Sequence, residues 1–324
     1  MFIRGYIFFS MKNLKNAENI FAGTEVLVTL RDWTRFAVSL FSKSGLFFGQ
    51  GMSTAYDEAV YLLCHTLGLP TDGGVETFFD AKLTAPEISA VKDVLFRRAG
   101  ERVPAAYITR EAWLGDFRFY VDERTIVPRS YFVEMIPEKI LPWVPGMDAD
   151  AVERVADVCT GGASIAILLA HAFPNAQVDA CDISDAALEV ARKNVADYGL
   201  DERVSLWKSD VLDGVPADDA SYDIIVSNPP YEPEELRETL PEEFRREPDN
   251  ALFSGADGLD VIRKLLPQAA KKLKRNGVLL IEVGGLQDAL AEAFPQLEIS
   301  WLETADGSDC ICAISASSLC EVFA

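Results

Sequence analysis

From about Glu153 onward the sequence alternates between strand-like apolar runs and helical stretches, and this alternation limits the fold more than any other feature. Strands are predicted at residues 155–159, 176–182, 204–208, 223–227 and 278–283, with two more strand-like runs near Ile299 and Cys310. Strands separated by helices form a mostly parallel sheet that is covered on both faces. The predicted fold class is therefore α/β.

The first predicted strand ends in a turn of small residues. The stretch DVCTGGASIAI, which begins at Asp157, runs from this strand into an apolar helix. Backbone N–H groups at such a helix start can approach a ligand closely. The turn does not spell G-x-G-x-x-G, so taken alone it does not indicate a dinucleotide site.

Acidic residues follow the next two predicted strands. Asp182 ends the second strand, where a carboxylate can accept hydrogen bonds from both hydroxyls of a ribose. Asp210 follows the third strand, where it can accept a hydrogen bond from an adenine amine. A single acid at a strand end is commonly a solvated residue. Because several consecutive strand ends carry suitable groups, we interpret this edge of the sheet as a cofactor site.

The fourth predicted strand is followed by Asn-Pro-Pro-Tyr, residues 228–231. Two prolines fix φ twice and remove two N–H donors, so nearby carbonyls and the Asn228 side chain are left to bind another group. Open α/β sheets bind ligands beyond the carboxyl ends of their strands. We interpret that group as a substrate; a rigid turn without chemistry is the alternative.

The region before the α/β alternation has a different pattern. Between about Thr24 and Gly100 apolar residues recur at helical spacing, and Thr84 and Glu87 have the spacing of a capping box. Apolar and polar residues alternate over short runs between Trp113 and Pro128, which predicts a hairpin. The predicted organisation is a disordered extension at 1–23, in which Met11 is the expected true start, a helical domain at 24–112, a β-hairpin connector at 113–130 and an α/β domain at 131–324.

The net charge of −21 is unevenly distributed. Residues 1–129 contain equal numbers of acidic and basic side chains, so the whole excess lies in residues 130–324. A strongly acidic surface repels phosphate backbones and attracts basic proteins, which argues against free nucleic acid as a substrate. Solubility alone is an equally good explanation of the charge.

The remaining composition favours a cytoplasmic protein. The six cysteines are scattered and show no disulfide or zinc framework, and no apolar run is long enough to span a membrane. The two histidines, His65 and His171, lie inside helical apolar patterns, which favours a structural role for both. No metal site is predicted.

Several stretches together resemble class I S-adenosylmethionine-dependent methyltransferases, namely DVCTGGASIAI, VDACDIS, SDVL and IVSNPPY. The Asn-Pro-Pro-Tyr form is similar to that of enzymes that methylate planar nitrogens. Further stretches resemble the protein-glutamine N(5)-methyltransferases: ERVPAAYIT, FYVDERTIVPRS, EEFRREPDNALFSGADGL and GVLLIEVG. The VPRS and SWLET stretches resemble the branch that acts on large-subunit ribosomal protein L-three. The resemblance covers the chain from about Thr24.

The resemblance implies a Rossmann-like methyltransferase domain, whose last strand is antiparallel, preceded by a substrate-recognition domain of helices. It implies S-adenosyl-L-methionine as cofactor and a basic ribosomal protein, or the assembling ribosome, as partner, with no free nucleic acid and no membrane. The implied catalytic residues are Asn228, Pro229, Pro230 and Tyr231. The implied cofactor-binding residues are Asp157, Cys159, Thr160, Gly161, Ala163, Asp182, Ile183, Asp210, Val211 and Asn228.

One residue departs from the family pattern. Where the family has Thr-Gly-Ser-Gly-Cys, this chain has Thr160, Gly161, Gly162, Ala163 and Ser164. If this turn requires positive φ at Ala163, its methyl group is expected to weaken cofactor binding. Alternatively, the turn is shifted by one residue, so that Gly162 occupies the position that requires positive φ.

The resemblance also implies a mechanism in which position matters most. The lone pair of a glutamine amide nitrogen is delocalised, so Asn228 and the Pro229 carbonyl are expected to accept its two hydrogens and hold it in line with the methyl group. Tyr231 is expected to pack on the amide plane. Three other functions stay open: the same reaction on a release factor, adenine methylation in nucleic acid, and a non-catalytic role in ribosome assembly.

Overall fold

The computed structural model describes residues 16–71, 73–136 and 149–323. The chain divides into two compact units. The helical unit contains Met1–Glu111 and the short segment Pro241–Arg246, and the sheet unit contains Ala112–Leu240 and Glu247–Ala324. The division thus lies one residue before the predicted boundary at 112, and the hairpin is part of the sheet unit. No pattern in the sequence indicated that Pro241–Arg246 belongs to the helical unit.

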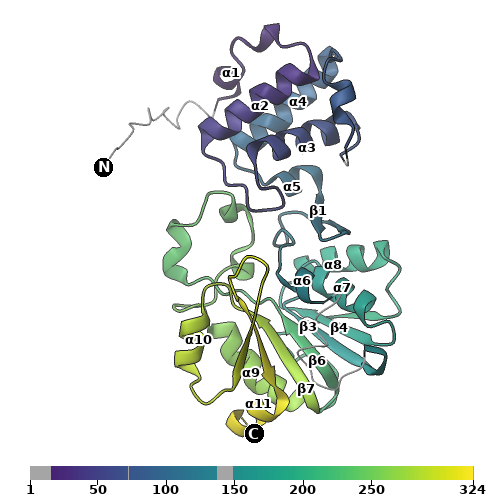
Figure 1. The fold of residues 1–324 in the computed structure, drawn as a ribbon, viewed down its shortest axis with the longest axis vertical. Coiled ribbons are helices and arrows are strands. Elements are labelled where there is room, and N and C mark those ends of the chain that lie inside the picture. Colours follow the sequence, from purple (N-terminus) through teal and green to yellow (C-terminus); the bar gives the residue numbers. More distant parts are fainter. Residues whose placement is uncertain (1–15, 72, 137–148, 324) are drawn as a thin grey trace. The chain divides into compact units, whose positions relative to one another are not determined.

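Local capping signals set the ends of the main helices of the helical unit (Figure 1). Helix α2 begins after Thr29, which forms a capping box with Asp32, and ends at Gly45 in the left-handed conformation. The predicted Thr84–Glu87 capping box is present at the start of α4. The helices are α1 (Ala17–Ile20), α2 (Leu30–Ser44), α3 (Ala55–Leu67), α4 (Ala85–Ala99) and α5 (Ala105–Thr109), with 3₁₀ turns η2 (Thr24–Val26) and η3 (Val75–Phe78).

The expectation of a disordered extension over residues 1–23 is wrong for its described part, while residues 1–15 lie outside the described residues. Asn16 caps α1 through its side chain. Phe21 is buried, and its ring lies 6.5 Å from that of Trp33 and 6.0 Å from that of Phe36. The aromatic residue in this polar stretch joins the core of the helical unit, which orders the residues around it.

A buried ion-pair network holds the segment Pro241–Arg246 in the helical unit. The Arg98 side chain is 1% exposed and donates to Glu58 at 2.6 Å and to Glu243 at 3.1 Å. Arg102 also donates to Glu243, at 3.1 Å. Because a buried charge is costly without partners, this network fixes the position of Glu243 within the unit.

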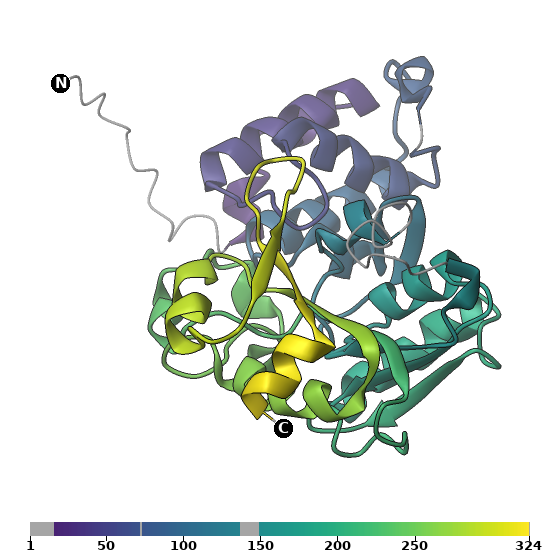
Figure 2. The same cartoon turned by 60° about the horizontal axis from the view of Figure 1, so that its bottom comes forward.

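The sheet unit contains a seven-stranded sheet in the order β5-β4-β3-β6-β7-β9-β8. The strands from β5 to β7 are parallel, and β9 is antiparallel to both β7 and β8, as predicted. Figure 2 shows β8 and β9 in yellow at one edge and the teal strands at the other. The strands are β3 (Arg154–Val158), β4 (Gln177–Asp182), β5 (Val204–Lys208), β6 (Tyr222–Ser227), β7 (Leu273–Glu282), β8 (Ile299–Leu302) and β9 (Ile311–Ser315).

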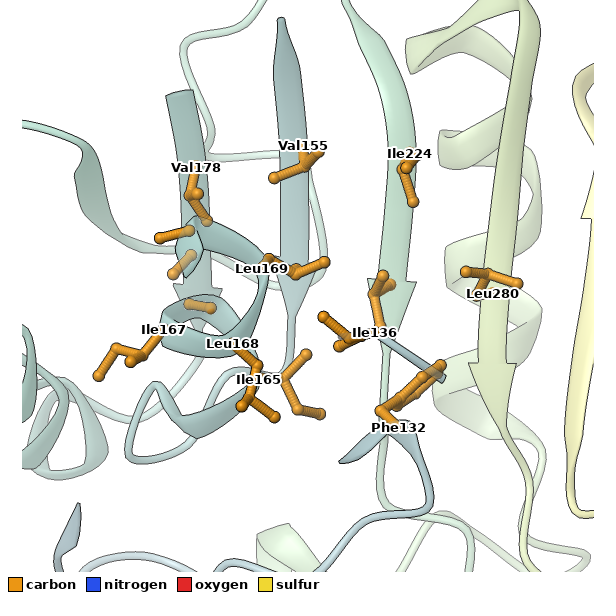
Figure 3. Packing of buried hydrophobic residues seen from close by; sticks show 14 of the residues in the cluster. Phe132, Ile136, Val155, Ile165, Ile167, Leu168, Leu169, Val178, Ile224 and Leu280 are labelled. Atoms are coloured by element: carbon orange, nitrogen blue, oxygen red, sulfur yellow. The ribbon is translucent and has the colours of Figure 1, made fainter. Parts of the chain in front are cut away.

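Helices cover both faces of this sheet, each over its own apolar core. Figure 3 shows one face, where Phe132 and Ile136 pack with Ile165, Ile224 and Leu280. The helices on this face are α6 (Phe132–Met135), α7 (Ser164–Ala172) and α8 (Asp185–Asp197), together with the hairpin of β1 (Glu111–Leu114) and β2 (Phe117–Tyr120). The other face carries α9 (Asp260–Lys272), α10 (Gln287–Ala293) and α11 (Ala316–Phe323).

No helix in the described ranges is long and apolar enough to cross a membrane.

The Arg98 network can be tested by an Arg98→Met substitution. Removing the guanidinium group leaves the buried Glu58 carboxylate without its partner and Glu243 with Arg102 alone, so we expect the free energy of unfolding to fall by about 3–5 kcal/mol. Arg31→Met is the matched control, because the Arg31–Asp80 pair is largely exposed and its loss should cost less than about 1 kcal/mol. Chemical denaturation measures the free energy of unfolding of both variants. Equal losses of stability in the two would contradict a structural role for the network.

Candidate active site

The residues predicted to bind ligands follow four adjacent strands of the sheet. Strands β5, β4, β3 and β6 lie side by side and run parallel, so their carboxyl ends meet at one edge. The predicted residues are contributed by the end of β3 and the turn after it, the end of β4 and the residue that follows, and the loops after β5 and β6. In sheets of this kind, that edge is where ligands bind.

The turn after β3 contains three residues with positive φ. They are Cys159 at 62°, Gly161 at 54° and Ala163 at 64°. Ala163 is fully buried, and its N–H donates to the Thr160 carbonyl at 2.9 Å. Gly162 is not among the glycines with positive φ. The alternative in which Gly162 takes over the permissive role is therefore wrong: Ala163 itself adopts the conformation that favours glycine.

Asp157 is buried and fixes this turn to the following helix. Its Oδ2 atom accepts hydrogen bonds from Thr160 Oγ1 at 2.5 Å and from the Ala166 N–H at 2.9 Å. Its Oδ1 atom has no partner within the described residues. Burial raises the pKa of Asp157 to about 7, although both donors act in the opposite direction. The orphaned oxygen gives this edge an acceptor that the protein itself does not satisfy.

Asp182 connects the end of β4 to the turn after β3. One carboxylate oxygen accepts from the Gly161 N–H at 2.9 Å, and the other from the Ser184 N–H at 2.9 Å. Burial raises the pKa of Asp182 despite these backbone donors. The neighbouring Ile183 side chain is 54% exposed, which is unusual for an aliphatic residue next to a sheet core.

The loop after β5 is strained and partly exposed. Val211 has a φ of 60°, which is rare for a β-branched residue, and it is buried. Cys181 Sγ donates to its carbonyl at 3.0 Å. Asp210 accepts from Lys264 at 2.7 Å, and both side chains are about half exposed. An adenine amine at Asp210 would therefore share this carboxylate with a lysine.

Close packing holds the Asn-Pro-Pro-Tyr segment. Pro229 and Pro230 are buried, whereas Asn228 and Tyr231 are partly exposed. A Cβ atom at Gly284 would lie 2.5 Å from the Tyr231 ring, and one at Gly258 would lie 2.2 Å from the Tyr231 carbonyl oxygen. Both glycines have positive φ. Only glycine at these two positions lets Tyr231 lie where it does.

Comparisons with known proteins agree with this architecture. The model of the methyltransferase small domain matches residues 143–257. The ribosomal protein uL3 glutamine methyltransferase of Neisseria meningitidis is 48% identical over 90% of this chain and 95% of its own length. The enzymes of that name from Burkholderia pseudomallei and Bradyrhizobium diazoefficiens are 48% and 42% identical, over 90% and 92% of this chain and 95% and 93% of their own lengths.

This chain belongs to the ribosomal protein uL3 glutamine methyltransferase family. Among solved structures, the hMettl16 catalytic domain in complex with MAT2A 3'UTR hairpin 1 matches with a TM-score of 0.47 and 18% identity, over 72% of this chain and 81% of that one. That likeness indicates no function for this chain.

Sequence reasoning assigned no role to several buried polar residues around the site of this family member. Asn194 donates to the Gly162 carbonyl at 2.8 Å and exchanges two hydrogen bonds with the backbone of Tyr120. It thereby fixes the hairpin to the turn after β3. Arg129, Glu247 and Glu282 form a second group beside Asn228. These three occur within stretches that carry the resemblance (VPRS, EEFRREP and LLIEVG), which was the only signal for them.

Most acids of the acidic segment, defined as residues 232–249, are paired with arginines. It contains eight acidic and three basic residues. Arg237 pairs with Glu234 and Asp249, and three other carboxylates pair with arginines elsewhere in the chain. Those three are Glu242, Glu243 and Glu247. Five of its acids therefore have structural partners, which leaves little unpaired negative charge in this segment to attract a basic protein.

An Asp157→Asn substitution tests the burial of this carboxyl group. Because its pKa is about 7 in the folded protein and 3.8 as the ordinary value, the folded state binds the proton more tightly, and stability falls as pH rises between these values. The asparagine variant lacks this loss. The free energy of unfolding of the variant minus that of the unmodified protein should therefore be about 2 kcal/mol larger at pH 7 than at pH 5. Urea denaturation at the two pH values measures this difference, and Asp201→Asn at an exposed position is the control. A stability difference that does not vary with pH would contradict the raised pKa of Asp157.

Proposed function

We propose that this protein transfers a methyl group from S-adenosyl-L-methionine to the side-chain amide nitrogen of a glutamine in ribosomal protein uL3. The observation that carries the proposal is the near full-length identity of 48% to enzymes of that name, combined with an intact Asn-Pro-Pro-Tyr segment at the carboxyl edge of the sheet. Such a substrate would place the reaction in the cytoplasm.

The polar groups around the turn after β3 fit this cofactor. Asp182 has carboxylate lone pairs left to accept from ribose hydroxyls, and the exposed Ile183 side chain offers an apolar surface for the face of an adenine. Cys159, Thr160, Gly161 and Ala163 form the turn beside the orphaned Asp157 oxygen. Asp210 and Val211 would border the adenine edge. When bound, S-adenosyl-L-methionine supplies an electrophilic methyl group on a positively charged sulfur.

The substrate amide is activated by position rather than by a strong base. Asn228 Oδ1 and the Pro229 carbonyl would accept the two hydrogens of the glutamine amide, which fixes the direction of the nitrogen lone pair. These acceptors also stabilise the positive charge that develops on nitrogen as it forms the new bond, and one of the two amide hydrogens then leaves as a proton, which restores a neutral amide. The Asn228 Nδ2 atom lies 3.5 Å from the Arg129 carbonyl oxygen, an orientation that leaves Oδ1 available.

The residues after Asn228 keep these acceptors rigid. Pro229 and Pro230 fix two φ angles and are buried, so the Pro229 carbonyl has little freedom to turn. Tyr231 is held between Gly258 and Gly284 and would pack on the plane of the amide. Burial raises the pKa of its phenol, so the ring is neutral at physiological pH.

The helical unit is proposed to recognise the protein substrate, free or within an assembling ribosome. A basic ribosomal protein suits the net charge of −21, which disfavours free nucleic acid. Adenine methylation is the alternative that uses the same acceptors. The test is to incubate the protein with labelled S-adenosylmethionine and ribosomal proteins, release factors or RNA from a strain that lacks the activity. Label on uL3 alone supports the proposal; label on a release factor or on RNA contradicts it.

The substrate contact predicts a specific effect of Asn228→Ala. Loss of one positioned acceptor in the transition state typically costs on the order of 3 kcal/mol, so kcat should fall roughly a hundredfold or more. Cofactor affinity should stay within a few fold, because the Asp182 contacts remain. Single-turnover kinetics and calorimetry measure the two quantities, with exposed Asn175→Ala as the matched control. Near-normal turnover would remove Asn228 from the mechanism.

The cofactor contact predicts the opposite pattern for Asp182→Ala. Two charge-assisted hydrogen bonds to the ribose would be lost, so the dissociation constant should rise about tenfold or more. Asp185→Ala is the control, because Asp185 lies three residues away and pairs with Lys208 at the surface. Calorimetric titration distinguishes them. Equal affinity in both variants would mean that the ribose binds elsewhere.

A further inference from the structure

A short stretch of the sheet unit crosses the carboxyl ends of β6 and β7. We name residues 129–131 the strap. Its first residue presents a carbonyl oxygen to Asn228 Nδ2 at 3.5 Å. Its other two residues donate to Glu282, the last residue of β7. Because Ser227 is in register with Ile281, Asn228 and Glu282 follow at equivalent positions on neighbouring strands.

One side of the strap is held by Glu247. The Arg129 guanidinium donates two parallel hydrogen bonds to this carboxylate, at 2.6 and 2.7 Å. The Glu247 side chain is fully buried, and its Oε1 atom also accepts from the Val127 N–H at 3.4 Å. A bidentate pair of this kind fixes direction as well as distance. Arg129 therefore cannot turn without breaking both bonds.

The other side of the strap is held by Glu282, which is 4% exposed. Its Oε2 atom accepts from Ser130 Oγ at 2.5 Å and from the Tyr131 N–H at 3.2 Å. The strap is also anchored at both ends, because Val127 and Phe132 are completely buried. Figure 3 shows Phe132 in the core over the sheet, so the chain cannot shift there without opening that core.

We propose that the strap orients the side-chain amide of Asn228, and that Glu247 and Glu282 are positioning residues that hold it. The inference rests on the proposed function of Asn228 as the substrate acceptor. With Nδ2 directed at the Arg129 carbonyl, Oδ1 is the atom that faces the substrate. The 3.5 Å contact is long for a hydrogen bond, as is common for catalytic contacts before substrate binds.

Glu282 makes this arrangement sensitive to pH. Burial raises its pKa to about 7, whereas Ser130, Tyr131 and the Arg129 guanidinium lower it. The other titratable groups that act with it are the Tyr231 phenol and the Cys310 thiol, both neutral at physiological pH. The ionised carboxylate is the stronger acceptor. Protonation below pH 7 therefore loosens the strap, and kcat should fall as the pH is lowered through that value.

The kinetic test compares Glu282→Gln and Glu247→Gln with Glu292→Gln, an exposed glutamate on α10. At pH 8 and saturating substrates, we expect kcat to fall at least about tenfold in the first two variants and to be unchanged in the third. Cofactor affinity should stay within about twofold, because no cofactor contact is altered. In Glu282→Gln the decline of kcat below pH 7 should be absent. The same decline in that variant would overturn the role of Glu282.

A second measurement reports on Asn228 without catalysis. In protein labelled with ¹⁵N-asparagine, the side-chain amide resonances of Asn228 are assigned by their loss in Asn228→Asp. They should shift in both strap variants and not in Glu292→Gln. Unchanged resonances would overturn the strap, even if kcat falls. If the unmodified protein fails to methylate uL3 but the resonances shift, the proposed function fails and the strap stands.

Discussion

Asp157 accepts two hydrogen bonds on one carboxylate oxygen in a place that excludes water, and its contacts join the end of β3 to the turn and to α7. Other acids repeat this arrangement along the same edge of the sheet. Asp182 ties the end of β4 to Gly161, and Glu247 and Glu282 hold the strap beside Asn228. A buried carboxylate is stable only when donors surround it, so each acid fixes the backbone that supplies its donors. The edge is therefore shaped before any ligand arrives, which is the condition for catalysis by position.

The same edge stores backbone strain. Cys159, Ala163 and Val211 have left-handed φ values, although none is a glycine, and each costs roughly 1–2 kcal/mol in that conformation. Ala163 is the residue at which the chain departs from the family pattern. Its methyl group is completely buried in the core under α7, so the burial of that group offsets part of the strain. Strain of this kind persists where surrounding contacts determine the backbone, and here those contacts are the hydrogen bonds of Asp157 and Asp182.

The fold could be predicted because its signals are local. Alternating strands and helices gave the parallel sheet, and the Thr84–Glu87 box gave the start of α4. The positions of the candidate site residues at strand ends were predictable for the same reason, since each lies at or just after the end of a strand that is visible in the sequence. The contacts of Glu243 and Glu247 were not predictable. Their arginine partners lie 145 and 118 residues away, and no periodicity or turn rule relates such distant positions.

These contacts also determine how much charge the acidic segment exposes. Two of its carboxylates, Glu243 and Glu247, are buried and paired, so they are not part of a charged surface. The excess negative charge of the sequence lies in acids elsewhere in the sheet unit, and those are the acids available to the proposed basic partner. Six residues of the segment belong to the helical unit, and Glu247, which follows them directly, holds the strap beside Asn228. The chain therefore passes directly from a segment held by Arg98 and Arg102 to the residue that holds the strap, and the buried glutamates at both places are fixed by ion pairs.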